Sequence, residues 1–280
     1  MPPRFWISLT TTPTRIHLIR PVLESLVHQT APVEGVLLNV PYRLQRNGAA
    51  YQLPAWLHEL PCVRVNRSAD YGPATKLLGA LEVEREPDAY IIVVDDDTVY
   101  PLCMVEAYRN CDLGGRQTVY CTAGFNISDP LDCCREVRGN LEPVRGHMVP
   151  VQVVEGYGSV LYRRGLFHDD IFHIMDLPEY VVYSDDLYLS NYLGRHRVLR
   201  WTIAPPGFGG DGFWKDRVLA YGREGDALHL GQRVGSNRER YAQAIRYFLE
   251  NKIYWLGGGA LPLPNGRAHG CAPNFLGGEA

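Results

Sequence analysis

The chain has 280 residues, of which 46% are hydrophobic and 21% charged, and its 28 basic and 31 acidic side chains give a formal net charge of −3. This balance is typical of a soluble globular enzyme and excludes a dedicated nucleic-acid binder, which would carry a basic surplus. No run approaches about 18 consecutive apolar residues and no signal peptide opens the chain, so we expect a soluble cytoplasmic protein without a membrane span.

The first hundred residues alternate strand and helix patterns. Apolar runs predict strands at 5–9, 35–40, 63–66 and 90–94. Helical spacing and helix-starting prolines predict helices at 15–29, 55–60 and 73–83. This alternation implies βαβ units, and therefore an α/β fold with a mostly parallel, Rossmann-like central sheet flanked by helices.

The second half is less regular. We expect a strand at 118–122, a hairpin within 143–154, a helix from Ser184 as N-cap to 193, and a helix at 237–252. No linker divides the chain, so we expect one domain over 1–256, with a nucleotide-binding half (1–100) and an elaborated acceptor and catalytic half (101–256). The Gly- and Pro-rich tail 257–280 is expected to be extended.

The seven cysteines are odd in number, two are adjacent, and none forms a C-x-x-C pair. This pattern favours reduced thiols over a disulfide framework or a zinc site.

Three polar clusters follow predicted strands. Thr10-Thr11-Thr12 with Arg15 follows the first strand, Asp70-Tyr71-Gly72 with Lys76 follows the third, and Asp95-Asp96-Asp97 follows the fourth. Ligands of parallel sheets bind beyond the carboxyl ends of the strands, so three clusters at one edge predict a site. Any one cluster alone is more typical of a solvated loop.

The acidic triplet has two functional interpretations, both with a divalent cation, because carboxylate oxygens suit Mg²⁺ or Mn²⁺ and the cation offsets their mutual repulsion. One is a nucleotide-sugar glycosyltransferase, in which a D-x-D carboxylate holds the metal against the donor diphosphate. The other is a haloacid-dehalogenase-type phosphohydrolase, with Asp95 as nucleophile in D-D-D-T-V. An acidic loop without a ligand is the third possibility.

The lysine distribution favours the transferase. The dehalogenase-type site needs a basic residue, usually lysine, before its second acidic pair, here Asp185-Asp186. No lysine occurs between Asp97 and Asp185. In that family the nucleophile also follows the first strand, whereas Asp95 follows the fourth predicted strand.

Four segments, in this order, resemble GT-A-fold glycosyltransferases: ISLTTTPTRIHLIRPVLESLVHQT, YGPATKLLGAL, VVDDDTVYP and SDDLYLSNYL. The resemblance covers roughly residues 5 to 195. It is strongest to the small soluble enzymes that build capsid glycans in chloroviruses, including a xylosyltransferase. It implies a UDP-sugar donor, with UDP-xylose favoured, and a glycan acceptor on a viral capsid protein in the host cytoplasm. A non-catalytic carbohydrate-binding protein is a further alternative.

The resemblance also implies roles for individual residues. Thr10 and Arg15 would line the nucleoside pocket. Asp70 would accept a hydrogen bond from the nucleotide base, and Lys76 would approach the diphosphate. Asp95 would contact the ribose or sugar. The metal would be held by Asp97, with His229 as a second candidate ligand, and Asp96 receives no role.

On the acceptor side, the Asp185-Asp186 pair matches the family's E-D-[hydrophobic] element, with Asp185 in place of Glu. Asp186 is therefore the candidate base that deprotonates the acceptor hydroxyl in an inverting displacement, with Asp185 as the fallback. A helix N-terminus also favours acidic residues without any catalytic role. Aromatic residues beside glycines suit sugar rings, which makes Tyr157, Phe213 and Trp214 candidate acceptor contacts, although each also suits plain core packing.

Overall fold

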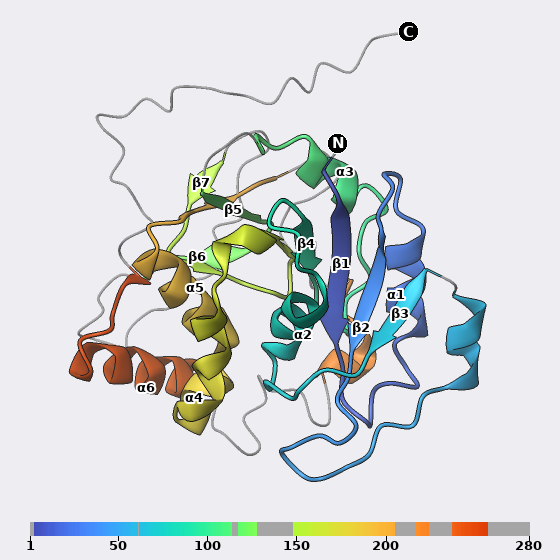
Figure 1. The fold of residues 1–280 in the computed structure, drawn as a ribbon, viewed down its shortest axis with the longest axis horizontal. Helices are drawn as coiled ribbons and strands as arrows, with labels where there is room; N and C mark the ends of the chain where they lie inside the picture. The colour runs from blue at the N-terminus through green and yellow to red at the C-terminus, as the bar shows by residue number, and fades with distance from the viewer. Residues whose placement is uncertain are drawn as a thin grey trace, which may run out of the picture.

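A computed structural model of the chain describes residues 3–60, 62–113, 117–127, 148–204, 217–223 and 237–256. One eight-stranded sheet, in the order β3-β2-β1-β4-β9-β5-β10-β7, forms its centre (Figure 1). Its strands are β1 (Phe5–Thr10), β2 (Gly35–Asn39), β3 (Val63–Asn66), β4 (Tyr90–Val93), β5 (Thr118–Cys121), β7 (Val149–Pro150), β9 (Val160–Arg163) and β10 (Leu199–Thr202). A second, two-stranded sheet pairs β6 (Gly124–Phe125) with β8 (Val153–Val154).

The helices among the described residues flank this sheet. They are α1 (Arg20–Val27), α2 (Thr75–Val83), α3 (Met104–Arg109), α4 (Glu179–Val182), α5 (Asp185–Arg195) and α6 (Asn237–Glu250). Short 3₁₀ helices span Ala55–Glu59, Arg164–Leu166, Asp169–Asp176 and Ala220–Arg223. The expected α/β class is confirmed: strands β3, β2, β1 and β4 run parallel, and β9 enters antiparallel between β4 and β5.

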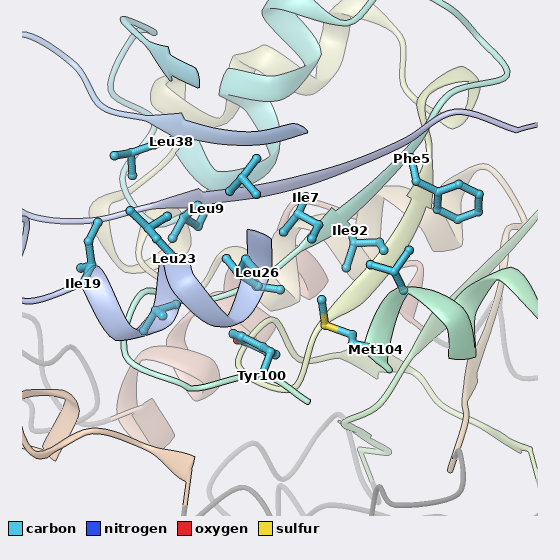
Figure 2. Close-up of a cluster of buried hydrophobic side chains, with 14 of the residues drawn as sticks. Phe5, Ile7, Leu9, Ile19, Leu23, Leu26, Leu38, Ile92, Tyr100 and Met104 are labelled. Carbon is cyan, nitrogen blue, oxygen red and sulfur yellow. The ribbon is translucent and has the colours of Figure 1, made fainter. Parts of the chain in front are cut away.

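Both faces of the central strands β1, β2 and β4 are buried, which is why these strands read as mostly apolar runs, whereas the edge strand β3 is half-exposed. Successive residues of β1 point to opposite faces: Ile7 and Leu9 join a core with α1 and α3, whereas Trp6 joins a core with α2 and α5. Figure 2 shows Leu23 and Leu26 of α1 lying against the first of these faces. A third core joins α4, α5 and α6.

A buried polar network fixes α2 on the sheet. The Asn39 amide donates to the Ser8 hydroxyl (2.8 Å), and that hydroxyl donates to the Lys76 carbonyl (2.5 Å). Asn66 donates both to the Asn39 side chain (2.9 Å) and to the carbonyl of Gly79 (2.8 Å). Because buried polar groups are costly unless they are paired, this network selects one position for α2 and for Lys76.

Three expectations about local structure were wrong. The helix predicted at 15–29 begins at Arg20, because Pro21 lies in its first turn and would break a helix that had started earlier. Within the predicted hairpin 143–154, residues 143–147 lie outside the described part of the chain, and the described strands β7 and β8 pair with β10 and β6 and not with each other.

The third error concerns a helix cap. Ser184 precedes α5, but its hydroxyl donates to the carbonyl of Tyr180 (2.7 Å) and makes no capping bond to α5.

Two further expectations concern the oxidation state of the cysteines and the absence of a membrane-spanning helix. The described cysteines, Cys62, Cys103, Cys111 and Cys121, are free thiols. None of the described helices combines the length and apolar content that a membrane crossing requires. The predicted tail 257–280 lies outside the described residues.

Because α2 lies so close to β2, we expect a glycine-to-alanine substitution at Gly79 to destabilise the protein, although the same change usually stabilises a helix. Replacing glycine by alanine inside a helix normally stabilises it by about 0.5–1 kcal/mol. A Cβ on Gly79 would lie 2.7 Å from Asn39, so we expect Gly79→Ala to destabilise the protein by about 1–3 kcal/mol. Chemical denaturation measures this. Val83→Ala, at an exposed position of the same helix, is the control, and an equal or stabilising effect of Gly79→Ala would contradict the packing described here.

Candidate active site

One cavity of about 510 Å³ lies at the carboxyl ends of the parallel strands. The three polar clusters that follow β1, β3 and β4 meet there, as the sequence predicted, and the start of α5 and part of α6 complete it. The chemically active side chains that line it are Thr10, Thr11, Thr12, Arg15, Arg46, Asp70, Lys76, Asp95, Asp96, Asp97, Glu155, Tyr157, Asp185, Asp186, Arg240 and Tyr241. This volume is within the range of small-molecule sites.

Asp96, to which the sequence gave no role, is the buried anchor of the acidic triplet. Its carboxylate accepts from the Thr11 hydroxyl (2.6 Å) and from the Arg15 guanidinium (2.8 Å). Burial raises the pKa of Asp96, and Arg15 opposes that shift. Asp96 thereby fixes the turn after β1 to the loop after β4.

Asp95 is paired with a lysine. The Lys76 ammonium is buried and lies 2.8 Å from Asp95 Oδ1 and 3.2 Å from Asp185 Oδ2. Burial alone would lower the pKa of Lys76, but Asp185 and Asp95 raise it well above its usual value. The structure thus places Lys76 between two carboxylates that the sequence had assigned to different tasks.

Asp97 is the least compensated of the three aspartates. Its carboxylate lies 3.5 Å from Arg15, and burial together with Asp95 and Asp96 raises its pKa to about 7. Segment 217–223 covers it: Leu219 donates to the Asp97 carbonyl (2.7 Å), and a Cβ on Gly222 would lie 2.6 Å from the carboxylate. No side chain larger than hydrogen fits at position 222 without displacing Asp97.

The same segment also contacts Asp96 and Arg15. The Tyr221 hydroxyl donates to the Asp96 carbonyl (2.7 Å), and the Arg15 guanidinium stacks on the Tyr221 ring, 5.7 Å from its centre. The sequence gave no indication of this contact, because 125 residues separate the two partners.

The donor set suits a hard divalent cation held by few protein ligands. Among the described residues no group of three or more His, Cys, Asp or Glu side chains is arranged as a metal centre. Mg²⁺ and Mn²⁺ sites often use only one or two carboxylates, with the substrate phosphates completing the coordination. Asp97, crowded by two other carboxylates, is the side chain whose charge such a cation would offset. His229 lies outside the described residues.

The second acidic group begins α5. Asp186 accepts from the Gly156 backbone N–H (3.0 Å) and from the Tyr241 hydroxyl (3.4 Å), and burial and Asp185 raise its pKa to about 7. A Cβ at position 156 would lie 2.5 Å from the Lys76 ammonium, so a larger residue there would displace the lysine from its two carboxylates.

Two other predicted donor-side residues line the cavity with their polar atoms engaged. The Thr10 hydroxyl donates to the Asn39 carbonyl (2.8 Å). The Asp70 carboxylate accepts from the backbone N–H groups of Gly72 (2.9 Å) and Gln45 (2.6 Å). Both residues therefore shape the cavity wall, and their predicted contacts with a nucleoside stay predictions.

Of the predicted acceptor contacts, Tyr157 lines the cavity, and its backbone carbonyl accepts from the Tyr100 hydroxyl (2.9 Å). Phe213 and Trp214 lie outside the described residues. Sequence reasoning missed Glu155, Arg240 and Tyr241, which all line the cavity. Glu155 directly precedes the glycine-rich segment that drew attention to Tyr157, whereas the two α6 residues look like ordinary helix positions.

No protein-family model matches the chain, and no curated protein is recognisably similar to it in sequence. Solved structures with some likeness include S. aureus TarS 1-349 in complex with UDP-GlcNAc, which is 13% identical with a TM-score of 0.42 and covers 88% of this chain and 73% of that one. A second is a 4-diphosphocytidyl-2C-methyl-D-erythritol synthase, which is 12% identical with a TM-score of 0.43 and covers 72% of this chain and 89% of that one.

A further structure of TarS 1-349 is 14% identical with a TM-score of 0.40, and the match covers 68% of this chain but only 55% of that structure. Likeness at this level assigns no function, so the function has to come from the chemistry of the cavity.

The anchoring role of Asp96 predicts a loss of stability. Asp96→Ala leaves the Arg15 guanidinium without its closest carboxylate, and breaking a buried ion pair costs about 3–5 kcal/mol. Asp88→Ala is the control, because Asp88 is 85% exposed and its ion pair with Arg163 should contribute at most about 1 kcal/mol. Urea unfolding of both variants measures the difference, and equal losses would contradict the anchoring role.

Proposed function

We propose that the chain is a nucleotide-sugar-dependent glycosyltransferase that inverts the anomeric centre. The observation that carries this proposal is the meeting of two separate carboxylate groups in one cavity, the triplet after β4 and the pair at the start of α5. A single displacement needs charge compensation for a leaving diphosphate at one place and a base for the acceptor hydroxyl at another. The described cavity provides candidates for both.

The charge of the cavity supports a metal-bound donor. Seven carboxylates line the cavity against four cationic side chains, and Arg15 and Lys76, two of those cations, pair with carboxylates. An anionic diphosphate would be repelled by this surplus unless a cation accompanied it. Mg²⁺ or Mn²⁺, held by Asp97 with Asp95 nearby, would supply that charge when bound.

The chain's own residues would position the substrates. Besides the acidic triplet, the cavity of about 510 Å³ is lined by Thr10, Asp70, Leu44 and Tyr51, which are the candidates for contacts with a nucleoside. The acceptor hydroxyl would attack the anomeric carbon while a carboxylate near α5 takes its proton and the bond to the diphosphate breaks. For that proton the sequence favours Asp186, with Asp185 as the fallback.

The finer proposals rest on the sequence resemblance. They are UDP as the nucleotide, xylose as the sugar, a capsid glycan as the acceptor, and His229 as a metal ligand. Phe213 and Trp214 remain candidate acceptor contacts because aromatic residues beside glycines suit sugar rings. The single domain over 1–256, acting in the cytoplasm, is proposed from the sequence pattern.

One observation favours a second candidate, the phosphohydrolase. The sequence lacks a lysine between Asp97 and Asp185, but Lys76 places an ammonium 2.8 Å from Asp95, where a phosphoaspartate would need one. The absence of a lysine between Asp97 and Asp185 therefore no longer argues against the phosphohydrolase. The position of Asp95 after the fourth strand, and the presence of a second carboxylate pair in the same cavity, still favour the transferase.

A thermal-shift experiment tests the proposal. We expect UDP and UDP-sugars to raise the melting temperature only with Mn²⁺ or Mg²⁺ present, because ligands stabilise the state that binds them. Asp97→Asn should fold, since it removes one of three crowded carboxylates, and should lose the metal-dependent stabilisation. Asp88→Asn is the matched control and should keep it. Undiminished stabilisation of Asp97→Asn would contradict the metal assignment.

Phosphate release from p-nitrophenyl phosphate separates the two candidates. The transferase releases none, with or without metal. Release that Asp95→Asn abolishes would favour the phosphohydrolase, whereas UDP-sugar cleavage without phosphate release would exclude it.

A further inference from the structure

Glu155 differs from the other carboxylates of the cavity. It follows β8, and its backbone N–H donates to the Ala123 carbonyl (3.0 Å), which fixes the residue at the edge of the small sheet. Its side chain lines the cavity, and its Oε2 atom is buried without a hydrogen-bond partner among the described residues. Asp185 Oδ2 also lacks a hydrogen bond, but it lies 3.2 Å from the Lys76 ammonium, whereas no ion pair among the described residues reaches Glu155. Burying an unpaired polar atom costs free energy, so an orphaned oxygen in a cavity indicates a partner supplied by the ligand.

Asp186, by contrast, is already engaged. Its two oxygens accept hydrogen bonds from the Gly156 N–H (3.0 Å) and the Tyr241 hydroxyl (3.4 Å). Burial and Asp185 raise the pKa of Asp186 to about 7 and Lys76 opposes that shift, so Asp186 is mostly ionised at the higher pH at which Glu155 loses its proton. A carboxylate with both oxygens occupied is better suited to hold a fixed charge than to bind a new hydroxyl group.

We propose that Glu155 is the catalytic base for the acceptor in the transferase reaction, and that Asp186 is a positioning residue that keeps Glu155 basic. This inference rests on the proposed function and names a residue that the sequence did not. Glu155 would accept a hydrogen bond from the acceptor hydroxyl through its unpaired oxygen. As the acceptor oxygen bonds to the anomeric carbon, its proton passes to Glu155, and the electron pair of the breaking C–O bond leaves with the nucleoside diphosphate.

The electrostatic surroundings of Glu155 support this role. Burial, and then the negative charge of Asp186, raise the pKa of Glu155 to about 8, which is close to the pH at which a general base works best. The other groups that face it are the Tyr241 hydroxyl from α6 and the Cys121 thiol from β5, both neutral at that pH because burial raises their pKa values. Lys76, whose charge opposes the pKa shift of Asp186, is itself paired with Asp95 and Asp185.

The direct test compares Glu155→Gln with Glu250→Gln, an exposed carboxylate at the end of α6. The readouts are UDP-sugar hydrolysis, with water as the acceptor, and the thermal shift with UDP and Mn²⁺. We expect Glu155→Gln to lose about 10²-fold or more in turnover while its UDP shift is unchanged, and Glu250→Gln to match the wild type. Unchanged turnover in Glu155→Gln, in a wild type that is active, would overturn the inference alone. A wild type that neither binds nor cleaves any UDP-sugar would overturn the proposed function.

The pH profile separates the base from the positioning residue. In the wild type turnover should rise with pH toward about 8, as Glu155 ionises. Asp186→Asn removes a negative charge that raises the pKa of Glu155, so this rise should move to lower pH with turnover retained in part. If Asp186→Asn abolishes the rise and Glu155→Gln keeps it, Asp186 is the base and the inference fails.

A stability measurement tests the burial of Glu155 without any substrate. Because the pKa of Glu155 is raised from its usual 4.5 to about 8, the folded state binds more protons than the unfolded state between these values. Stability should therefore fall as pH rises through this window. Glu155→Gln should fall less steeply than Glu250→Gln between pH 5 and 8.5, and identical slopes would contradict the buried environment on which the inference depends.

Discussion

The site depends on one buried ammonium. Lys76 lies between Asp95, at the end of β4, and Asp185, at the start of α5, so a single cation joins segments that are 90 residues apart in the chain. Burying a charge costs several kcal/mol unless it is well paired, so we expect the loss of either carboxylate to destabilise the fold. The sheet network holds α2 through Ser8, and the absence of a side chain at Gly156 leaves space for the ammonium.

This pairing leaves some carboxylates compensated and others not. Arg15 and Lys76 pair with Asp96 and Asp95, which become structural anchors. Asp97 and Glu155 have no cation of comparable closeness among the described residues, and burial raises the pKa of each. A bound cation at Asp97, or a proton taken from the substrate at Glu155, would supply the positive charge that these two carboxylates lack. Asp95 and Asp96 therefore stabilise the structure, whereas Asp97 and Glu155 are the candidates for binding and catalysis.

Much of the fold was predictable from the sequence, because strands buried on both faces are apolar throughout and parallel strands bring their ends to one edge. The sequence predicted where the site lies in the fold, but not which of its side chains pair with one another. The expected approach of Lys76 to a diphosphate stays a prediction, whereas its ion pairs with Asp95 and Asp185 could not be read from the sequence. The roles of Asp96 and Glu155 depend on which side chains distant segments place beside them, and local pattern does not encode that. Pro21 is the exception, since its effect on the start of α1 is local and readable.

A double-mutant cycle on Lys76 and Asp185 tests most directly whether this ammonium joins the two carboxylate groups. Free energies of unfolding would be measured for Lys76→Met, Asp185→Asn and the double variant, with Asp88→Asn replacing Asp185→Asn as the control. The double variant should be less destabilised than the sum of the two single variants by more than about 1 kcal/mol, because each single change leaves charge unpaired in the interior. Additivity within about 0.5 kcal/mol, as expected for the control pair, would contradict the account.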